Sequence, residues 1–120
     1  MSILRLAGIL GFLGVALGAF GAHGLRARVG PEMIEVWKTG VLYHLFHTLA
    51  LLAVAVAAPR IGAAKVVATL FTVGIVIFSG SLYVLVLTGK GWLGAVTPVG
   101  GVAFLAGWAA LTASAGRVPR

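Results

Sequence analysis

The 120-residue sequence contains no cysteine and only two acidic residues, Glu32 and Glu35. Without cysteine, the chain forms no disulfide, no thiolate nucleophile and no cysteine-ligated metal site. Charged residues make up 9% of the chain, against about a quarter in an ordinary soluble domain. Hydrophobic residues make up 61%, so the chain cannot cover its own surface with polar groups. We therefore expect residues 1–120 to form a single membrane domain.

The few charges are mostly positive, with nine Lys and Arg residues and a formal net charge of +7. They stand singly or in pairs between long apolar runs, which is how the flanks of membrane helices contact lipid headgroups. A nucleic-acid footprint would cluster its basic residues on one face. We therefore expect membrane lipid as a partner and no nucleic acid.

Four long apolar segments run over about 3–22, 40–58, 66–87 and 93–113. Each has about the 20 residues that a helix needs to cross a hydrocarbon core of about 30 Å. The runs are continuously apolar rather than alternating, which indicates helices rather than strands of a barrel. The sequence thus predicts an all-α integral membrane four-helix bundle. Gly24 is expected to end the first helix in a left-handed conformation.

The linker at 30–39 differs from these segments because it is amphipathic. Pro31 suits a first helical position, and Glu32 and Glu35 then fall near the positive end of the helix dipole. Trp37 lies on the apolar side, at the depth where lipid headgroups begin. We predict a short interfacial helix between the first two membrane helices, and we expect Trp92 at the interface as well.

Four crossings place both termini on one side of the membrane. On that side are five basic residues: Arg5, Arg60, Lys65, Arg117 and Arg120. The other side carries four: Arg26, Arg28, Lys38 and Lys90. Because cytoplasmic loops are enriched in Lys and Arg, we predict cytoplasmic termini in a bacterial inner membrane.

Small residues recur at helical spacing in two segments. In the first segment these are Gly11, Gly14, Gly18 and Gly21, and in the fourth they are Gly100, Ala103, Gly107 and Ala110. Spacings of three and four place each set on one helix face, where small residues let neighbouring backbones approach closely. We predict that these faces form the main helix contacts. The pattern does not distinguish contacts within one chain from contacts in a homo-oligomer.

The scarce polar side chains gather where an antiparallel bundle brings alternate helix ends to one leaflet. This candidate polar site consists of His23, Tyr43, His44, His47, Ser79, Ser81, Tyr83 and Thr97. His44 and His47 are three residues apart and share one face of a helix. An ionisable group inside a membrane helix is costly and by default marks a functional site.

Three interpretations of these histidines remain open. They bind a metal or haem, they relay protons or line a polar cavity, or they hydrogen-bond across helices and hold the packing. The structural interpretation is favoured, and we assign neither a metal nor a cofactor. No recognised catalytic pattern is present, since no nucleophile-elbow motif surrounds any serine.

Five motifs in order along the chain carry a family resemblance. They are GAFGAHGL at 18–25, YHLFH at 43–47, FSGSLY at 78–83, TPVGG at 97–101 and FLAGW at 104–108. Together they resemble the family named domain of unknown function 423, or uncharacterised protein family 0382, which is similar to the eukaryotic transmembrane protein 256. The resemblance covers nearly the whole chain. It implies a small multi-helix integral membrane protein and no particular activity.

The sequence as a whole favours a non-enzymatic accessory or interaction subunit of the membrane. The first alternative is a small transport or channel protein. It would have to oligomerise, because one four-helix chain encloses little room for a pathway. The second alternative is a protein that binds metal, haem or lipid at the end carrying His23, His44 and His47.

Overall fold

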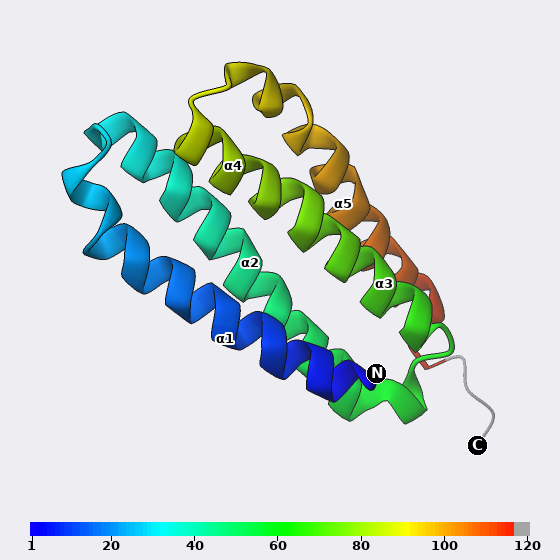
Figure 1. The fold of residues 1–120 in the computed structure, drawn as a ribbon. Helices are drawn as coiled ribbons and strands as arrows, with labels where there is room; N and C mark the ends of the chain where they lie inside the picture. The colour runs from blue at the N-terminus through cyan, green and yellow to red at the C-terminus, as the bar shows by residue number, and fades with distance from the viewer. Residues whose placement is uncertain (117–120) are drawn as a thin grey trace.

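The computed structural model describes residues 1–116, which form helices joined by short turns (Figure 1). The elements are α1 (Ile3–Ala22), η1 (Leu25–Ala27), α2 (Pro31–Ala57), η2 (Ala58–Arg60), α3 (Ala64–Gly74), η3 (Ile75–Ser79), α4 (Gly80–Thr88), η4 (Gly91–Ala95) and α5 (Thr97–Ser114). Three of the η segments are short 3-10 helices, whereas η3 is a π-helical turn. Because η3 follows α3 without a break, α3, η3 and α4 form one rod.

Within the described residues, four helical rods are long and apolar enough to cross a membrane. They are Ile3–Ala27, Pro31–Arg60, Ala64–Thr88 and Gly91–Ser114. The all-α fold with four candidate membrane spans is therefore confirmed. The bundle measures 55 × 26 × 20 Å, so its long axis exceeds the ~30 Å thickness of a hydrocarbon core.

The predicted interfacial helix at 30–39 is wrong as a separate element, because these residues are the first turns of α2. Pro31 occupies the first helical position as expected, but no second break follows before Pro59. Gly40 does not interrupt the helix, because the absence of a side chain there lets the Tyr83 ring of α4 pack against it. A lone glycine weakens a helix by about 1 kcal/mol, which tertiary packing readily offsets.

The aromatic and acidic residues predicted for the interface separate in the structure. Trp37 is only 2% exposed and packs inside the bundle, so it does not face lipid, and its depth near the headgroups stays a prediction. Glu32 and Glu35 are exposed in the first turns of α2, where Glu35 pairs with Lys38 at 3.4 Å. Trp92 is exposed on η4.

The helix ends show a second difference from the sequence expectation. Gly24 has φ −72° and stays right-handed, because the chain continues directly into the 3-10 turn η1. Left-handed glycines instead follow α4, at Gly89 with φ 73°, and α5, at Gly116 with φ 75°. At the opposite end of the bundle, Gly62 N–H donates to the Ser114 carbonyl at 3.1 Å, so the α2–α3 connection is tied to the end of α5. Arg117 and Arg120 lie outside the described residues.

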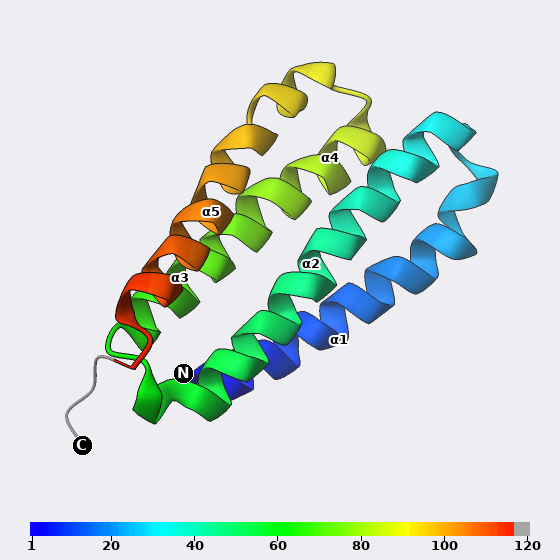
Figure 2. The same cartoon turned by 180° about the vertical axis from the view of Figure 1, so that it is seen from behind.

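Helix α2 lies between the other rods (Figures 1 and 2). It contacts α1 on one side and α3, η3 and α4 on the other, while α5 packs against α3 and η3. One buried apolar cluster lies in the half of the bundle near the chain termini and includes Leu51, Val67 and Phe71. A second cluster surrounds Trp37 and Leu25 near the α1–α2 turn. The buried polar groups described below lie between these clusters along α2.

Candidate functional site

The two buried histidines lie at the middle of a membrane helix rather than at one end. His44 is the middle residue of the 27-residue α2, about 20 Å along the helix from Pro31 at 1.5 Å per residue. His44 is 3% and His47 4% exposed. The expectation that all the polar residues meet at one end is therefore wrong for this pair. The reason is that α2 begins at Pro31 and not near residue 40.

His44 connects three helices through both of its ring nitrogens. Its Nε2 lies 2.8 Å from the Leu10 carbonyl oxygen of α1. Its Nδ1 lies 2.9 Å from the hydroxyl oxygen of Tyr83 on α4. In addition, the buried Thr48 hydroxyl donates to the His44 carbonyl at 2.8 Å. Hydrogen bonds between membrane helices contribute about 0.6 kcal/mol each on average and at most about 1.7 kcal/mol.

The imidazole reaches the Leu10 carbonyl because residue 14 has no side chain. A Cβ atom at Gly14 would lie 3.3 Å from His44 Cδ2 and 2.5 Å from Leu45 Cδ2. In an α-helix the carbonyl of one residue points toward the amide four residues later, so Gly14 borders the approach to Leu10. This glycine therefore exposes a backbone acceptor to α2.

The same arrangement occurs one heptad further along α1. The Trp37 indole Nε1–H donates to the Leu17 carbonyl at 2.8 Å. Gly21 follows Leu17 by four residues, and a Cβ there would lie 2.5 Å from Trp37 Cδ1 and 2.6 Å from Nε1. The acceptors Leu10 and Leu17 are thus one heptad apart on α1, and the donors His44 and Trp37 are one heptad apart on the antiparallel α2. One helix register satisfies both bonds.

His47 connects α2 to α5 instead. Trp108 Nε1–H donates to His47 Nε2 at 3.1 Å, and His47 Nδ1 lies 2.9 Å from the Tyr43 carbonyl oxygen. The imidazole stacks on the Phe104 ring with the ring centres 3.6 Å apart and the planes 9° apart. It also meets Phe71 edge-on at 5.4 Å. An aromatic pair of this kind contributes about 0.5–1.5 kcal/mol beyond the area it buries.

These partners assign the proton of each ring. A carbonyl oxygen only accepts, so the Leu10 contact requires a proton on His44 Nε2, and the Tyr43 contact requires one on His47 Nδ1. An indole N–H only donates, so His47 Nε2 must keep its lone pair for Trp108. As neutral rings, the two histidines therefore hold opposite tautomers, and in that state the Tyr83 hydroxyl donates to His44 Nδ1.

The remaining members of the candidate polar site lie in separate contacts. The Ser79 hydroxyl on η3 donates to the Gly40 carbonyl of α2 at 2.6 Å. Ser81 and Thr97 share a hydrogen bond of 2.6 Å, which joins α4 to the start of α5. The Tyr43 side chain is partly exposed and packs on Phe78.

His23 is not part of the buried network. It is exposed at the end of α1, where its backbone N–H donates to the Ala19 carbonyl at 3.1 Å. The position follows from the helix itself, since residue 23 caps α1 while His44 and His47 lie in the middle of α2. The predicted group of three histidines is therefore a buried pair and one surface residue.

The predicted small-residue faces both lie at helix contacts. On α1, Gly11 and Gly18 face Thr48 and Val41 of α2, alongside the two positions described above. On α5, Gly100 lies against Phe78 of η3 and Gly107 against Phe71 of α3. Each glycine face therefore meets its own neighbour in the bundle, and the two faces do not meet each other.

Sequence reasoning missed three members of the network: Trp108, Thr48 and the Leu10 carbonyl. Trp108 belongs to one of the five motifs, but its place in the second half of α5 assigned it to the wrong end. A signal for the Leu10 carbonyl was available, because a glycine stripe one heptad in register with two ring donors indicates open backbone acceptors.

The network leaves little capacity for a metal. Both ring nitrogens of His44 and of His47 already have partners in the protein. A metal bound to either ring would have to displace one of these partners. Across residues 1–116, no three His, Cys, Asp or Glu side chains are grouped to hold a metal ion.

Comparison with known proteins agrees with the architecture. Residues 17–101 match the family described as "Protein of unknown function (DUF423)". The chain is 48% identical over 120 residues to the UPF0382 inner membrane protein YgdD of Escherichia coli K12, covering 98% of this chain and 92% of that protein. It is 46% identical over 113 residues to the UPF0382 membrane protein YwdK of Bacillus subtilis, covering 92% of each.

A fungal protein is similar over the same length. The UPF0382 membrane protein C1782.12c of Schizosaccharomyces pombe is 40% identical over 117 residues, covering 92% of this chain and 98% of that protein. No solved structure matches the chain. The predicted family and the inner-membrane, multi-pass location are confirmed. With a family match over most of its length and relatives of this identity, the chain belongs to the DUF423 family of UPF0382 membrane proteins.

Proposed function

We propose that this protein is a non-enzymatic accessory or interaction subunit whose buried polar network holds four helices in one arrangement. The observation that carries the proposal is that each buried histidine uses both ring nitrogens inside the bundle. A general base or a metal ligand needs a nitrogen that can reach a substrate or an ion. The two rings instead link α2 to α1, α4 and α5, which supports a structural role.

The outer surface supports the interaction part of the proposal. A groove of about 740 Å³ lies between α2 and α5 and is lined mainly by aromatic and aliphatic side chains. Phe46 and Leu105 on its borders are 59% and 70% exposed. Small residues on its α5 wall, such as Gly101, let another helix approach closely in a membrane. We propose a membrane helix of a partner protein as the occupant.

The first experiment tests the structural role of the histidines. His47→Leu should lower the unfolding temperature in detergent, because it leaves the Trp108 indole N–H without an acceptor in an apolar interior. The control is Leu105→Ala, which removes an exposed side chain of α5 that makes none of these bonds. An unchanged unfolding temperature for His47→Leu would contradict the structural interpretation.

The second experiment tests the interaction itself. A photo-crosslinking amino acid at position 105 should give one discrete adduct with another membrane protein in native membranes. The same amino acid at Val76, exposed on η3 and outside this groove, should not. An adduct with a second copy of the chain would favour the oligomeric transport alternative. Adducts with lipid alone at both positions would overturn the proposed interaction.

A further inference from the structure

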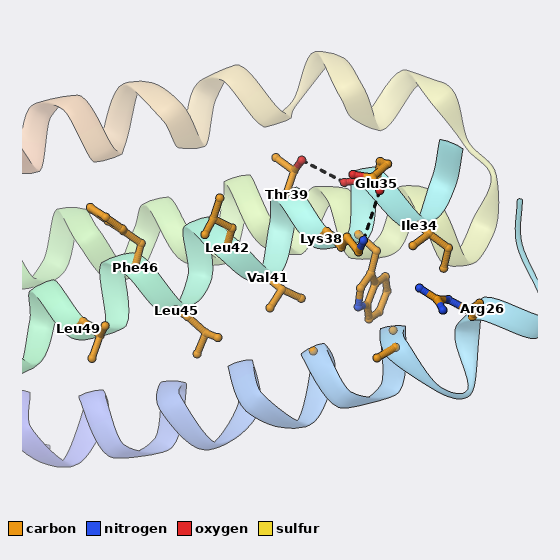
Figure 3. Close-up of a pocket in the computed structure, with 14 residues that line it drawn as sticks. Arg26, Ile34, Glu35, Lys38, Thr39, Val41, Leu42, Leu45, Phe46 and Leu49 are labelled. Carbon is orange, nitrogen blue, oxygen red and sulfur yellow. Dashed lines mark hydrogen bonds and ion pairs between the residues drawn. The ribbon is translucent and has the colours of Figure 1, made fainter. Parts of the chain in front are cut away.

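A second groove runs along the other side of α2, between α1 and α2 (Figure 3). Its volume is about 630 Å³. Gly18 and Gly21 line it on α1, where Val41 and the Trp37 ring of α2 pack against the two glycines and form part of the opposite wall. After Thr39, every residue of α2 that lines the groove is apolar.

The charged residues of this groove are all at one end. Arg26 of η1 extends its guanidinium toward the open space, and Glu35 and Lys38 lie across from it on α2 (Figure 3). Glu35 is paired with Lys38 at 3.4 Å, whereas Arg26 makes no ion pair with any residue from 1 to 116. The mouth therefore carries two positive charges and one negative charge.

The groove is thus polar and basic at its mouth and apolar along its length. From Lys38 to Leu49 it follows eleven residues of α2, or about 17 Å at 1.5 Å per residue. That length is close to half of the ~30 Å hydrocarbon core, which is the depth of one leaflet. An unpaired guanidinium binds a phosphate through two parallel hydrogen bonds, and basic pockets between membrane helices bind anionic headgroups.

We propose that this groove binds one anionic phospholipid. Its phosphate contacts Arg26 and Lys38, and one acyl chain lies along Leu42, Leu45 and Leu49. The net positive charge at the mouth selects an anionic lipid over a zwitterionic one with the same chains. This site is separate from the groove between α2 and α5 and does not depend on the proposed partner helix.

The test measures lipid binding to the purified full chain in detergent by native mass spectrometry. Dioleoyl phosphatidylglycerol should be retained at one molecule per chain, about tenfold more tightly than dioleoyl phosphatidylcholine. Arg26→Gln should remove that preference, because it deletes the charge that meets the phosphate. The matched control is Arg28→Gln, which removes a neighbouring exposed arginine that does not line the groove.

A variant that binds the lipid more tightly distinguishes a specific effect at the groove from a general loss of folding. Glu35→Gln removes the negative charge at the mouth and should tighten phosphatidylglycerol binding about threefold. Ala22→Phe should block the mouth, whereas Ala19→Phe, also exposed on α1 but outside the groove, should not. Equal retention of both lipids would overturn the proposal. So would equal losses in the Arg26→Gln and Arg28→Gln variants.

Discussion

Two interfaces of this bundle contain glycines, and different groups fill the space that the glycines leave. Between α1 and α2, Gly14 and Gly21 each border a polar ring that bonds a backbone carbonyl. Between α5 and the rod containing α3 and η3, Gly100 instead borders the backbone of Phe78 in η3, and Gly107 borders the ring of Phe71 in α3. The contact is also reciprocal, since Gly74 of α3 borders the Phe104 ring of α5.

The difference lies in what fixes each interface. Lipid gives helices no hydrophobic reason to associate, so close packing and hydrogen bonds must supply the specificity. At α1/α2, the bonds of His44 and Trp37 are one heptad apart, and a slip of one turn would break both. At α3/α5, complementary shape fixes the helix register, because a phenyl ring fits only where the opposite helix has no Cβ. The same spacing of small residues in the sequence is therefore found at an interface fixed by hydrogen bonds and at one fixed by ring packing.

The α3/α5 interface should be the less tolerant of an added methyl group. A Cβ at residue 100 would lie 2.7 Å from Phe78 Cα, and backbone cannot rotate away as a side chain can. Gly100→Ala should destabilise the bundle by about 3 kcal/mol, the upper part of the range for overpacking. The measurement is the free energy of unfolding in mixed detergent micelles.

Gly101→Ala is the matched control for that substitution. The nearest atom to its added Cβ is the ring carbon Cδ2 of Phe78, at 3.9 Å. Its effect should stay within about 0.5 kcal/mol, and it should be stabilising if helix propensity dominates. If the two alanine variants unfold at the same denaturant concentration, the close approach of α5 to η3 is wrong.

The α1/α2 interface should be weakened by Gly21→Ala through a different route. The new Cβ would collide with the indole ring, and the displaced Trp37 would lose its bond to the Leu17 carbonyl. We expect a loss of about 2 kcal/mol in unfolding free energy, accompanied by a change in tryptophan emission.

For this variant the control is Gly11→Ala on the same helix face. Its Cβ would meet Thr48 Cγ2 at 3.5 Å, an ordinary van der Waals contact. Stability should change little and the tryptophan emission should not shift. Equal destabilisation by both variants would show that helix propensity, rather than the Trp37 contact, controls this interface.

The sequence predicted the helices and their packing faces better than it predicted the site. Segment length and hydropathy determine the four spans, because a membrane helix must satisfy its own backbone. The amphipathic turns before Gly40 resembled a separate helix because amphipathicity does not distinguish a surface helix from the entrance of a longer one. That error moved the expected start of α2, and with it the depth of His44 and His47.

Contacts made through the backbone are harder to predict from sequence for a further reason. Residue types identify side-chain donors, but any residue supplies a carbonyl, so Leu10 and Leu17 are indicated only indirectly, by the glycines four residues later. Ser79 and Tyr83 were grouped correctly as polar, yet one bonds a backbone carbonyl and the other an imidazole. Only the helix register decides between such partners.

A double-mutant cycle between His44 and Tyr83 sharpens the comparison at the level of one bond. His44→Leu alone should cost about 1–2 kcal/mol, because it removes two interhelical bonds and leaves the Tyr83 hydroxyl unpaired. Tyr83→Phe should cost less, since the His44–Leu10 bond remains. The coupling energy from unfolding free energies should be between about 0.6 and 1.7 kcal/mol. Additive effects would mean that the two side chains do not interact.

The smallest expected effect concerns the histidine that faces α5. Trp108→Phe removes one hydrogen bond and keeps an aromatic ring, so unfolding free energy should fall by about 0.6 kcal/mol. The proton on His47 should nevertheless stay on Nδ1, because the Tyr43 carbonyl still requires a donor. Nitrogen NMR of labelled histidine should therefore report opposite tautomers for His44 and His47 both before and after the substitution. If both rings carry the proton on the same nitrogen, the hydrogen bonds described for one of the two histidines are wrong. The contact of His44 with α1 or that of His47 with α5 then differs from the one described.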